Sequence, residues 1–294
     1  MRIAVFTKNR TNPAYAAARL GAARVAKRFG AETVDFVPQT PDDPVEQSQL
    51  IDEALAMRPD AIVLAPVHPV RVNEALLRIQ AAGVPLFGFV NPIPAGRCIT
   101  YVGSDDYRLG AEVADHLYRH LGRTGEVLLV SGPAASVTSV PRMRAFRDTA
   151  RAYPAIRLLG PCMGAYDRKR ARQEVAQWLS QNSPPRGVLA ANDVMALGAL
   201  DALREAVQKP AISGVNAIPE AIRAIKEGDM LASADFNAMG MAALATECAL
   251  RHLRGQPVPE RIELPVQVVD RANFTQWDLP FEQRPIPILE EIAT

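Results

Sequence analysis

Few residues of this 294-residue chain have types and spacings that suit catalysis or metal binding. His116 and His120 stand at i and i+4, which places two imidazoles on one helix face, but the sequence offers no third metal ligand beside them. Asp105 and Asp106 form a carboxylate pair whose place at a predicted helix start favours capping and hinge hydrogen bonding. No nucleophile with an adjacent base and no glycine-rich phosphate loop is found. We therefore expect no enzyme activity, no catalytic residue, no metal and no cofactor.

Uncharged polar residues at the ends of apolar runs suggest a different chemistry. Asn91 ends the run Phe89-Val90-Asn91, and Asn216 ends the similar run Gly214-Val215-Asn216. Carboxamides carry both donors and acceptors, so they recognise ligand hydroxyl groups without the cost of burying a charge. These positions favour binding of a small polar molecule.

Composition excludes several other classes of protein. Apolar residues make up 48% and charged residues 22%, as in ordinary globular proteins, and the formal net charge of +1 favours neither nucleic acid nor anionic membrane as a partner. The three cysteines, Cys98, Cys162 and Cys248, form no CxxC or Cys/His cluster, so we expect independent thiols. A strand pattern begins at Ile3 and leaves no room for a signal peptide ahead of it.

The elements that must position the polar residues form one series that occurs twice. Short β-branched runs alternate with amphipathic stretches, the pattern of βαβ units and a parallel sheet. The first series predicts strands at Ile3–Thr7, Glu32–Val37, Ala61–Pro66, Pro85–Asn91 and Ile99–Ser104, with helices from Pro13, at Pro44–Met57, at Val70–Ala82 and at Asp106–Leu121. The second predicts strands at Glu126–Ser131, Ile156–Gly160, Gly187–Asn192, Ala211–Asn216 and Met230–Phe236, with helices at Pro141–Ala152, Asp167–Gln181, Asp193–Ala206, Pro219–Glu227 and Ala238–Leu253.

The repeated series predicts an α/β fold of two similar, doubly wound parallel-sheet lobes joined by a three-segment hinge. We expect residues 1–103 plus 237–264 in the N-terminal lobe and residues 104–236 plus 265–294 in the C-terminal lobe. Ligands bind beyond the carboxyl ends of strands in open parallel sheets, which predicts a ligand cleft between the lobes. The proline-rich tail from Arg271 is expected to run extended along the second lobe, anchored by Trp277, with a short turn at Leu289–Ile292.

Several segments together resemble a known family over residues 1 to 270. They are Thr7 to Tyr15, Val102 to Gly110, Gly164 to Asp167, Ala191 to Ala199 and Gly214 to Asn216. The chain resembles the periplasmic solute-binding proteins of the ribose- and galactose-binding type, which share a fold with the effector domains of LacI-type repressors. The resemblance implies a type I periplasmic-binding fold and the substrate-binding role of a sugar ABC transporter.

The resemblance also implies a set of ligand-binding residues. Asn12 would cap a helix and contact the ligand, Tyr15 would stack on a sugar face, and Lys8 would reach a ligand hydroxyl or carboxylate. In the second lobe Asn192 would face the ligand while Asp193 caps a helix, and either Asp235 or Phe236 would point inward. The full set is Lys8, Asn12, Tyr15, Asn91, Val140, Tyr166, Asn192, Asn216 and Phe236.

The sequence departs from this family where sugar-binding members carry two arginines. Asn91 stands in place of one and Val140 stands near the place of the other, while Arg142 and Arg144 are expected on the structural side. A standard pyranose clamp is therefore not expected. The loss of charge favours a polyol, a deoxysugar or a furanose derivative, and Lys8 keeps a sugar acid open.

The expected function is capture of a sugar, polyol or sugar derivative by hinge closure and its delivery to an ABC transporter permease. We expect a monomer that binds no nucleic acid and is periplasmic once a leader has been removed, or cytoplasmic if Met1 is the native start. The alternative is the effector-sensing domain of a LacI-type regulator or of a membrane sensor. A regulator of that type needs a helix-turn-helix segment ahead of the first strand.

Overall fold

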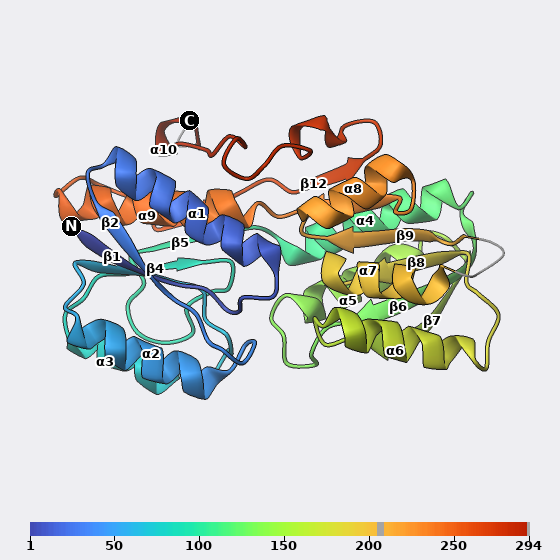
Figure 1. Ribbon diagram of the computed structural model, residues 1–294, viewed down its shortest axis with the longest axis horizontal. Coiled ribbons are helices and arrows are strands. Elements are labelled where there is room, and N and C mark those ends of the chain that lie inside the picture. The colour runs from blue at the N-terminus through green and yellow to red at the C-terminus, as the bar shows by residue number, and fades with distance from the viewer. Residues whose placement is uncertain (205–208, 293–294) are drawn as a thin grey trace. The chain divides into compact units, whose positions relative to one another are not determined.

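The computed structural model describes residues 1–204 and 209–292, in which strands and helices alternate along the chain (Figure 1). The chain divides into two compact units. Unit 1 contains Met1–Ser104, Asn237–Leu264 and Phe281–Thr294, and unit 2 contains Asp105–Phe236 and Pro265–Pro280. Each unit holds one six-stranded sheet, which confirms the predicted fold class of two similar α/β lobes.

The sheet of unit 1 has the order β11-β5-β4-β3-β1-β2, and every neighbouring pair is parallel. Helices cover both of its faces, so the apolar run of β3 is buried along its whole length. The strands are β1 (Arg2–Phe6), β2 (Glu32–Phe36), β3 (Ala61–Leu64), β4 (Leu86–Phe89), β5 (Thr100–Gly103) and β11 (Arg261–Glu263). The helices are α1 (Pro13–Arg28), α2 (Pro44–Ala56), α3 (Asn73–Ala81), α9 (Ala238–Leu253) and α10 (Leu289–Ile292).

Two helices of unit 1 that are far apart in sequence, α1 and α9, lie side by side (Figure 1). Gly21 allows this close approach, because a Cβ at that position would stand 2.4 Å from the carbonyl oxygen of Met239. Helix α1 begins at Pro13 with Asn12 as its N-cap, as the sequence predicts. The start of α1 therefore lies at the carboxyl end of β1.

The sheet of unit 2 has the order β12-β10-β9-β8-β6-β7. Its edge strand β12 runs antiparallel to β10, with Gln267 opposite Asp235, and so departs from the wholly parallel sheet that the sequence predicts. The chain enters unit 2 at Pro265 and runs back along β10, which reverses the strand direction. The strands are β6 (Thr124–Ser131), β7 (Ala155–Met163), β8 (Gly187–Ala190), β9 (Ala211–Val215), β10 (Ala232–Asp235) and β12 (Gln267–Asp270).

The helices of unit 2 follow the predicted order with small changes at their ends. The predicted helix Asp193–Ala206 is α7, and its residues 205 and 206 lie outside the described residues. The helices are α4 (Asp106–His120), α5 (Ser139–Ala150), α6 (Arg168–Leu179), α7 (Asp193–Leu203) and α8 (Pro219–Glu227). Asp105 caps α4 by accepting hydrogen bonds from the amides of Tyr107 and Arg108 at 2.9 and 3.0 Å.

The C-terminal tail corrects the expected assignment of residues 265–294 to one lobe. Trp277 anchors its first part in unit 2 by donating from Nε1 to Asp235 Oδ2 at 2.8 Å. From Phe281 onward the tail belongs to unit 1, where Arg24 of α1 donates to the carbonyl oxygens of Phe281 and Arg284 at 3.3 and 2.8 Å. The chain therefore passes between the units four times, once more than predicted.

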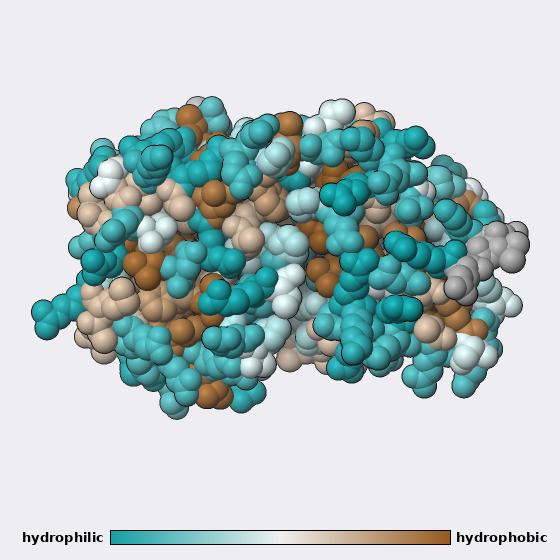
Figure 2. All heavy atoms as spheres, in the orientation of Figure 1, coloured by the Kyte–Doolittle hydropathy of each residue, from teal (hydrophilic) through white to brown (hydrophobic). Residues whose placement is uncertain are grey.

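Most of the surface seen in Figure 2 is hydrophilic, and the cysteines are not paired. Figure 2 shows hydrophilic side chains over most of the face in view, with hydrophobic ones in scattered groups. No helix within residues 1–204 and 209–292 is long and apolar enough to cross a membrane. The three cysteines are free thiols, as expected, and burial raises the pKa of Cys162 to about 11.

Candidate functional site

Two side chains at the start of α1 belong to the predicted site. Asn12 has an extended backbone and its Oδ1 accepts a hydrogen bond from the amide of Ala14 at 3.0 Å, so one carbonyl oxygen is committed to capping. Its Nδ2 donors are not used in the cap. Tyr15 is only 6% exposed and lies largely within the fold of unit 1.

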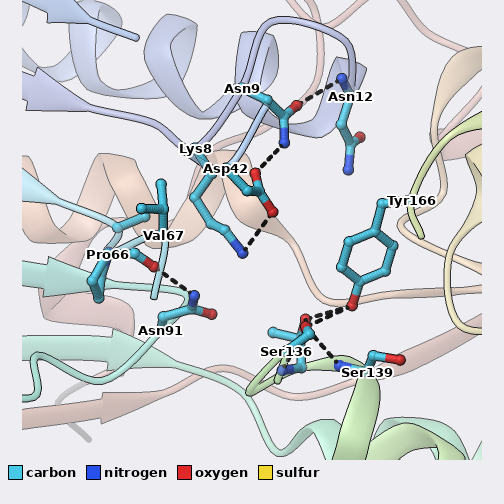
Figure 3. A network of polar contacts seen from close by, with 12 residues as sticks. Lys8, Asn9, Asn12, Asp42, Pro66, Val67, Asn91, Ser136, Ser139 and Tyr166 are labelled. Carbon is cyan, nitrogen blue, oxygen red and sulfur yellow. Dashed lines mark hydrogen bonds and ion pairs between the residues drawn. The ribbon is translucent and has the colours of Figure 1, made fainter. Parts of the chain in front are cut away.

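Lys8 follows β1 and forms an ion pair that the sequence analysis missed. Its Nζ lies 3.4 Å from Asp42 Oδ2, and the two side chains are 5% and 23% exposed. Asn9 donates from Nδ2 to the other carboxylate oxygen of Asp42 at 2.7 Å (Figure 3). The parallel pairing of β1 with β2 brings these residues together, because Lys8 and Asp42 both follow the carboxyl ends of those strands. The ion pair weakens the expectation that Lys8 binds a sugar acid.

Asn91 follows β4, and the nitrogen and oxygen of its carboxamide differ in their hydrogen bonding. Its Nδ2 donates to the carbonyl oxygen of Pro66 at 2.7 Å, whereas its Oδ1 is buried and has no hydrogen-bond partner among the described residues. A buried acceptor without a partner costs roughly 1–3 kcal/mol. A ligand hydroxyl that donates to Asn91 Oδ1 would recover this energy.

The loop whose Pro66 carbonyl oxygen accepts from Asn91 is held in place by the buried side chain of Gln47. Gln47 of α2 donates to the carbonyl oxygen of Ala65 at 3.0 Å and accepts from the amide of Val67 at 2.9 Å. The residue before Asn91 is held as well. The Tyr101 hydroxyl donates to the carbonyl oxygen of Val90, whose φ of +62° is unusual for a β-branched residue. Both contacts keep the Asn91 carboxamide in one orientation.

In unit 2, Tyr166 is tied to the loop that precedes α5. Its hydroxyl oxygen lies 3.0 Å from Ser136 Oγ and 2.8 Å from Thr138 Oγ1, and its backbone has a φ of +65° (Figure 3). Val140 lies in the first turn of α5 and is 52% exposed. Tyr166 is therefore held in place by hydroxyl groups, whereas Val140 presents an apolar side chain to solvent.

At the start of α7 the helix cap is Asn192 and not Asp193, the residue expected to cap. Asn192 has an extended backbone, caps α7 by accepting from the amide of Met195 at 2.9 Å, and is 2% exposed. Asp193, expected to cap, is the first helical residue, and its side chain turns into the core of unit 2. There it accepts hydrogen bonds from Ser233 Oγ at 2.7 Å and from the amide of Ile218 at 3.0 Å. Burial raises the pKa of Asp193 to about 7, although these two hydrogen bonds oppose the shift.

Asn216 and Phe236 follow β9 and β10. Asn216 adopts a φ of +121°, is 7% exposed, and donates its backbone amide to the carbonyl oxygen of Ala234 at 2.8 Å. Phe236 is 4% exposed and its ring centroid lies 5.5 Å from the guanidinium carbon of Arg142. Asp235 accepts the hydrogen bond from Trp277 Nε1 that anchors the tail.

Arg142 has the structural role that the sequence predicts. It donates from Nε to Asp106 Oδ1 at 2.7 Å and from a terminal nitrogen to the carbonyl oxygen of Ala191 at 2.8 Å. These contacts join the start of α4 to the end of β8, beside the Asn192 cap. Arg142 thereby positions the loop that carries Asn192.

One histidine of the i, i+4 pair on α4 contacts a carboxylate. His116 Nε2 lies 3.0 Å from Asp270 Oδ2 at the end of β12. Within the described part of the chain, no group of three or more His, Cys, Asp and Glu side chains has a geometry that could hold a metal ion.

Within each unit, most of the predicted site residues follow the carboxyl ends of parallel strands. Unit 1 places Lys8, Asn12 and Asn91 after β1 and β4, and adds Asn9 and Asp42. Unit 2 places Tyr166, Asn192, Asn216 and Phe236 after β7, β8, β9 and β10. Sequence reasoning had one signal for Asp42, its place in the turn between a strand and a helix that opens with Pro44. Nothing local indicated that it pairs with Lys8.

Comparisons with known proteins agree with the fold of this chain. The family model described as periplasmic binding protein domain matches residues 3–257. A xylitol-binding protein of Mycolicibacterium smegmatis is 26% identical over 204 residues, which cover 68% of this chain and only 58% of that protein. A D-apiose import binding protein of Paraburkholderia graminis is 26% identical over 282 residues, 94% of this chain and 89% of that protein.

Solved structures share the fold. An ABC transporter periplasmic solute-binding protein of Actinobacillus succinogenes with bound D-allose superposes with a TM-score of 0.86 at 25% identity, over 93% of this chain and 98% of that one. A solute-binding protein of Mycobacterium smegmatis with bound glycerol gives a TM-score of 0.83 at 26% identity, over 94% and 96% of the two chains.

Proposed function

The chain belongs to the family of periplasmic binding protein domains, and on this premise we propose that it captures an uncharged sugar or polyol and delivers it to an ABC transporter. The relatives are binding components of transport systems rather than regulators, so the transport function is favoured over a LacI-type effector domain. A membrane permease is the partner that this function requires. The family acts outside the cytoplasm, and we propose a leader that is removed on export.

The half-satisfied carboxamide of Asn91 is the observation that carries the proposal. Its buried Oδ1 lacks a donor among the described residues, and a sugar or polyol presents hydroxyl donors. Xylitol, D-apiose and D-allose appear in the names of similar proteins, and all three are uncharged polyhydroxy compounds. We propose the same class of ligand here, with a polyol, deoxysugar or furanose derivative favoured because the family resemblance implies arginines at the position of Asn91 and near that of Val140.

We propose that the two units are the lobes that close over this ligand. The strand ends of each unit would supply contacts, from Lys8, Asn12, Tyr15 and Asn91 in unit 1 and from Val140, Tyr166, Asn192, Asn216 and Phe236 in unit 2. Closure would require dihedral changes where the chain passes between units, including residues 104–105 and 236–237. The ligand would stabilise the closed form by its greater affinity for that form.

Thermal-shift screening followed by titration calorimetry tests the proposal. The purified protein is screened against xylitol, D-apiose, D-allose, D-ribose, myo-inositol and glycerol, because a ligand that binds the native state raises the Tm. We expect one of these or a close analogue to bind, and binding to weaken at least about tenfold in Asn91→Ala and Asn216→Ala, a loss of about 1.4 kcal/mol each.

The matched control is Asn182→Ala, which removes an exposed carboxamide whose Nδ2 bonds the carbonyl oxygen of Trp178. This variant should bind as the wild type does. Equal weakening in all three variants, or no binding of any neutral polyhydroxy compound, would contradict the proposed function.

A further inference from the structure

We propose that Asp42 sets the charge selectivity of the strand-end site of unit 1. By neutralising Lys8, it makes this site accept uncharged polyhydroxy ligands and disfavour the corresponding sugar acids. The inference rests on the proposed function, because it concerns the ligand of that same site. It assigns a specificity role to a residue that follows β2, outside the segments that carry the family resemblance.

Burying the Lys8 ammonium costs free energy unless an opposite charge lies near it. The Lys8 side chain is 5% exposed, and a buried cation requires an anion or several strong acceptors close by. A ligand carboxylate could supply that anion, and Lys8 would then select sugar acids. The structure instead places Asp42 Oδ2 3.4 Å from Lys8 Nζ, so the protein supplies the counter-charge itself.

Hydrogen bonds hold Asp42 in place. Its Oδ1 accepts from Asn9 Nδ2 at 2.7 Å, and its backbone amide donates to the carbonyl oxygen of Lys8 at 3.0 Å. The following residue, Asp43, caps α2 through the amides of Val45 and Glu46, both at 2.8 Å. The carboxylate of Asp42 is thus fixed by contacts on both sides and does not need a ligand to order it.

With Lys8 paired to Asp42, the groups left to bind a ligand are hydrogen-bond acceptors. In Figure 3 the Lys8 ammonium lies between the Asp42 carboxylate and the Asn91 carboxamide. Asp42 and Asn91 both present oxygen acceptors, and Asn91 Oδ1 is buried without a donor among the residues that the structure describes. A hydroxyl group can donate to such oxygens, whereas a ligand carboxylate has no proton to donate and is repelled by Asp42. Hydroxyl groups therefore fit this site and carboxylates do not.

The test removes the charge of Asp42 and keeps its shape. Asp42 has a φ of +58°, a left-handed conformation that Asn also tolerates, so Asp42→Asn leaves the backbone unstrained and keeps an acceptor for Asn9. Asp52→Asn is the matched control, because Asp52 lies on α2 of the same unit and pairs with Arg78 at the surface.

Calorimetry then compares three neutral compounds with their acids: xylitol with D-xylonate, D-ribose with D-ribonate, and D-allose with D-allonate. The ratio of the Kd of the acid to the Kd of its neutral partner should fall about tenfold or more in Asp42→Asn, and this gain should shrink at high salt. In Asp52→Asn the ratio should equal that of the wild type. The double variant Lys8→Met with Asp42→Asn should lose the gain, because it has no ammonium to attract the acid.

The outcomes separate this inference from the function on which it rests. If the wild type binds a neutral member and the ratio is unchanged in Asp42→Asn, the role of Asp42 is wrong while the binding function stands. A wild type that prefers an acid, or a gain that persists in the double variant, also overturns it. If the wild type binds no neutral member, the proposed function fails and this inference fails with it.

Discussion

At the scale of single residues, the polar side chains of this protein differ in how many of their hydrogen-bonding groups have a partner. Asn12 and Asn192 each commit their side-chain oxygen to a helix cap, whereas Asn91 keeps a buried acceptor that has no partner within the described part of the chain. Asp193 is the opposite case, because it is completely buried and accepts two hydrogen bonds. Side chains whose hydrogen bonds are made within the protein hold the site in shape. The Asn91 oxygen favours a ligand that can donate a hydrogen bond to it.

Asp193 should make stability depend on pH. Burial raises its pKa to about 7 in the folded state, while the unfolded value is that of an ordinary aspartate, about 3.9. Between these values the folded state binds the proton more tightly, so this residue stabilises the fold at low pH and that stabilisation is lost as the pH rises toward 7. Urea unfolding of the wild type and of Asp193→Asn from pH 4.5 to 8 should therefore give a difference in stability that changes up to about pH 7 and then levels off.

Asn fits the Asp193 position because its Oδ1 can accept from the amide of Ile218 while its Nδ2 donates to Ser233 Oγ. A second substitution, Asp201→Asn, controls for charge, since Asp201 pairs with Arg168 near the surface of the same unit. If the free energies of unfolding of the wild type and of Asp193→Asn change with pH in parallel, Asp193 is ionised throughout the range.

At the scale of elements, close helix packing in unit 1 depends on small residues. The buried side of α1 is rich in alanine, and Gly21 lies where α1 meets α9. The same helix presents the Asn12 cap, so its position against α9 also places one end of the candidate site. Packing and function are therefore linked through α1.

Gly21→Ala should destabilise unit 1. The added Cβ would stand 2.4 Å from the carbonyl oxygen of Met239, a backbone atom that cannot move away without shifting α9. Forcing extra volume into a packed core costs about 1–3 kcal/mol, which chemical denaturation can measure. Ala16→Ser, an exposed change on the same helix, should leave stability within about 0.5 kcal/mol of the wild type. Equal stability of both variants would mean that α1 and α9 separate without cost.

At the scale of the whole molecule, the chain passes between the units four times and the last passage is made by the tail. The tail is pinned in unit 2 by Trp277 and in unit 1 by Arg24, and the buried carboxylate of Glu247 accepts from the amide of Leu289 at 3.3 Å. Only residues 279 and 280 separate the Asp278 ion pair with Lys226 from the first tail carbonyl that Arg24 binds.

Arg24→Ala should release the tail from unit 1 without unfolding the unit. The guanidinium supplies donors to two tail carbonyls, and their loss should raise amide hydrogen exchange in residues 281–292 by at least about tenfold, which corresponds to 1.4 kcal/mol of local stability. Arg28→Ala, exposed on the same helix, is the control. Exchange that rises equally in both variants, or in neither, would show that Arg24 does not hold the tail.

Local patterns in the sequence were sufficient for the fold class and for most of the elements. The alternation of β-branched runs with amphipathic stretches predicts the strands from β1 to β10 and the helices between them, because hydrophobic periodicity is set by local geometry. The Asn12 cap and Pro13 start of α1 were readable for the same reason. The strand-end positions of Asn91, Asn192 and Asn216 followed once the strands were placed.

Contacts between distant segments were decided only by the tertiary structure. The Lys8–Asp42 pair joins the ends of two neighbouring strands, the buried Asp193 depends on Ser233 and Ile218, and the tail returns to unit 1 through Arg24. Each involves residues at least 25 positions apart along the chain or a choice between two neighbouring side chains. Sequence periodicity determines which face of an element is buried, whereas the partner of a buried charge depends on three-dimensional packing that no local pattern encodes.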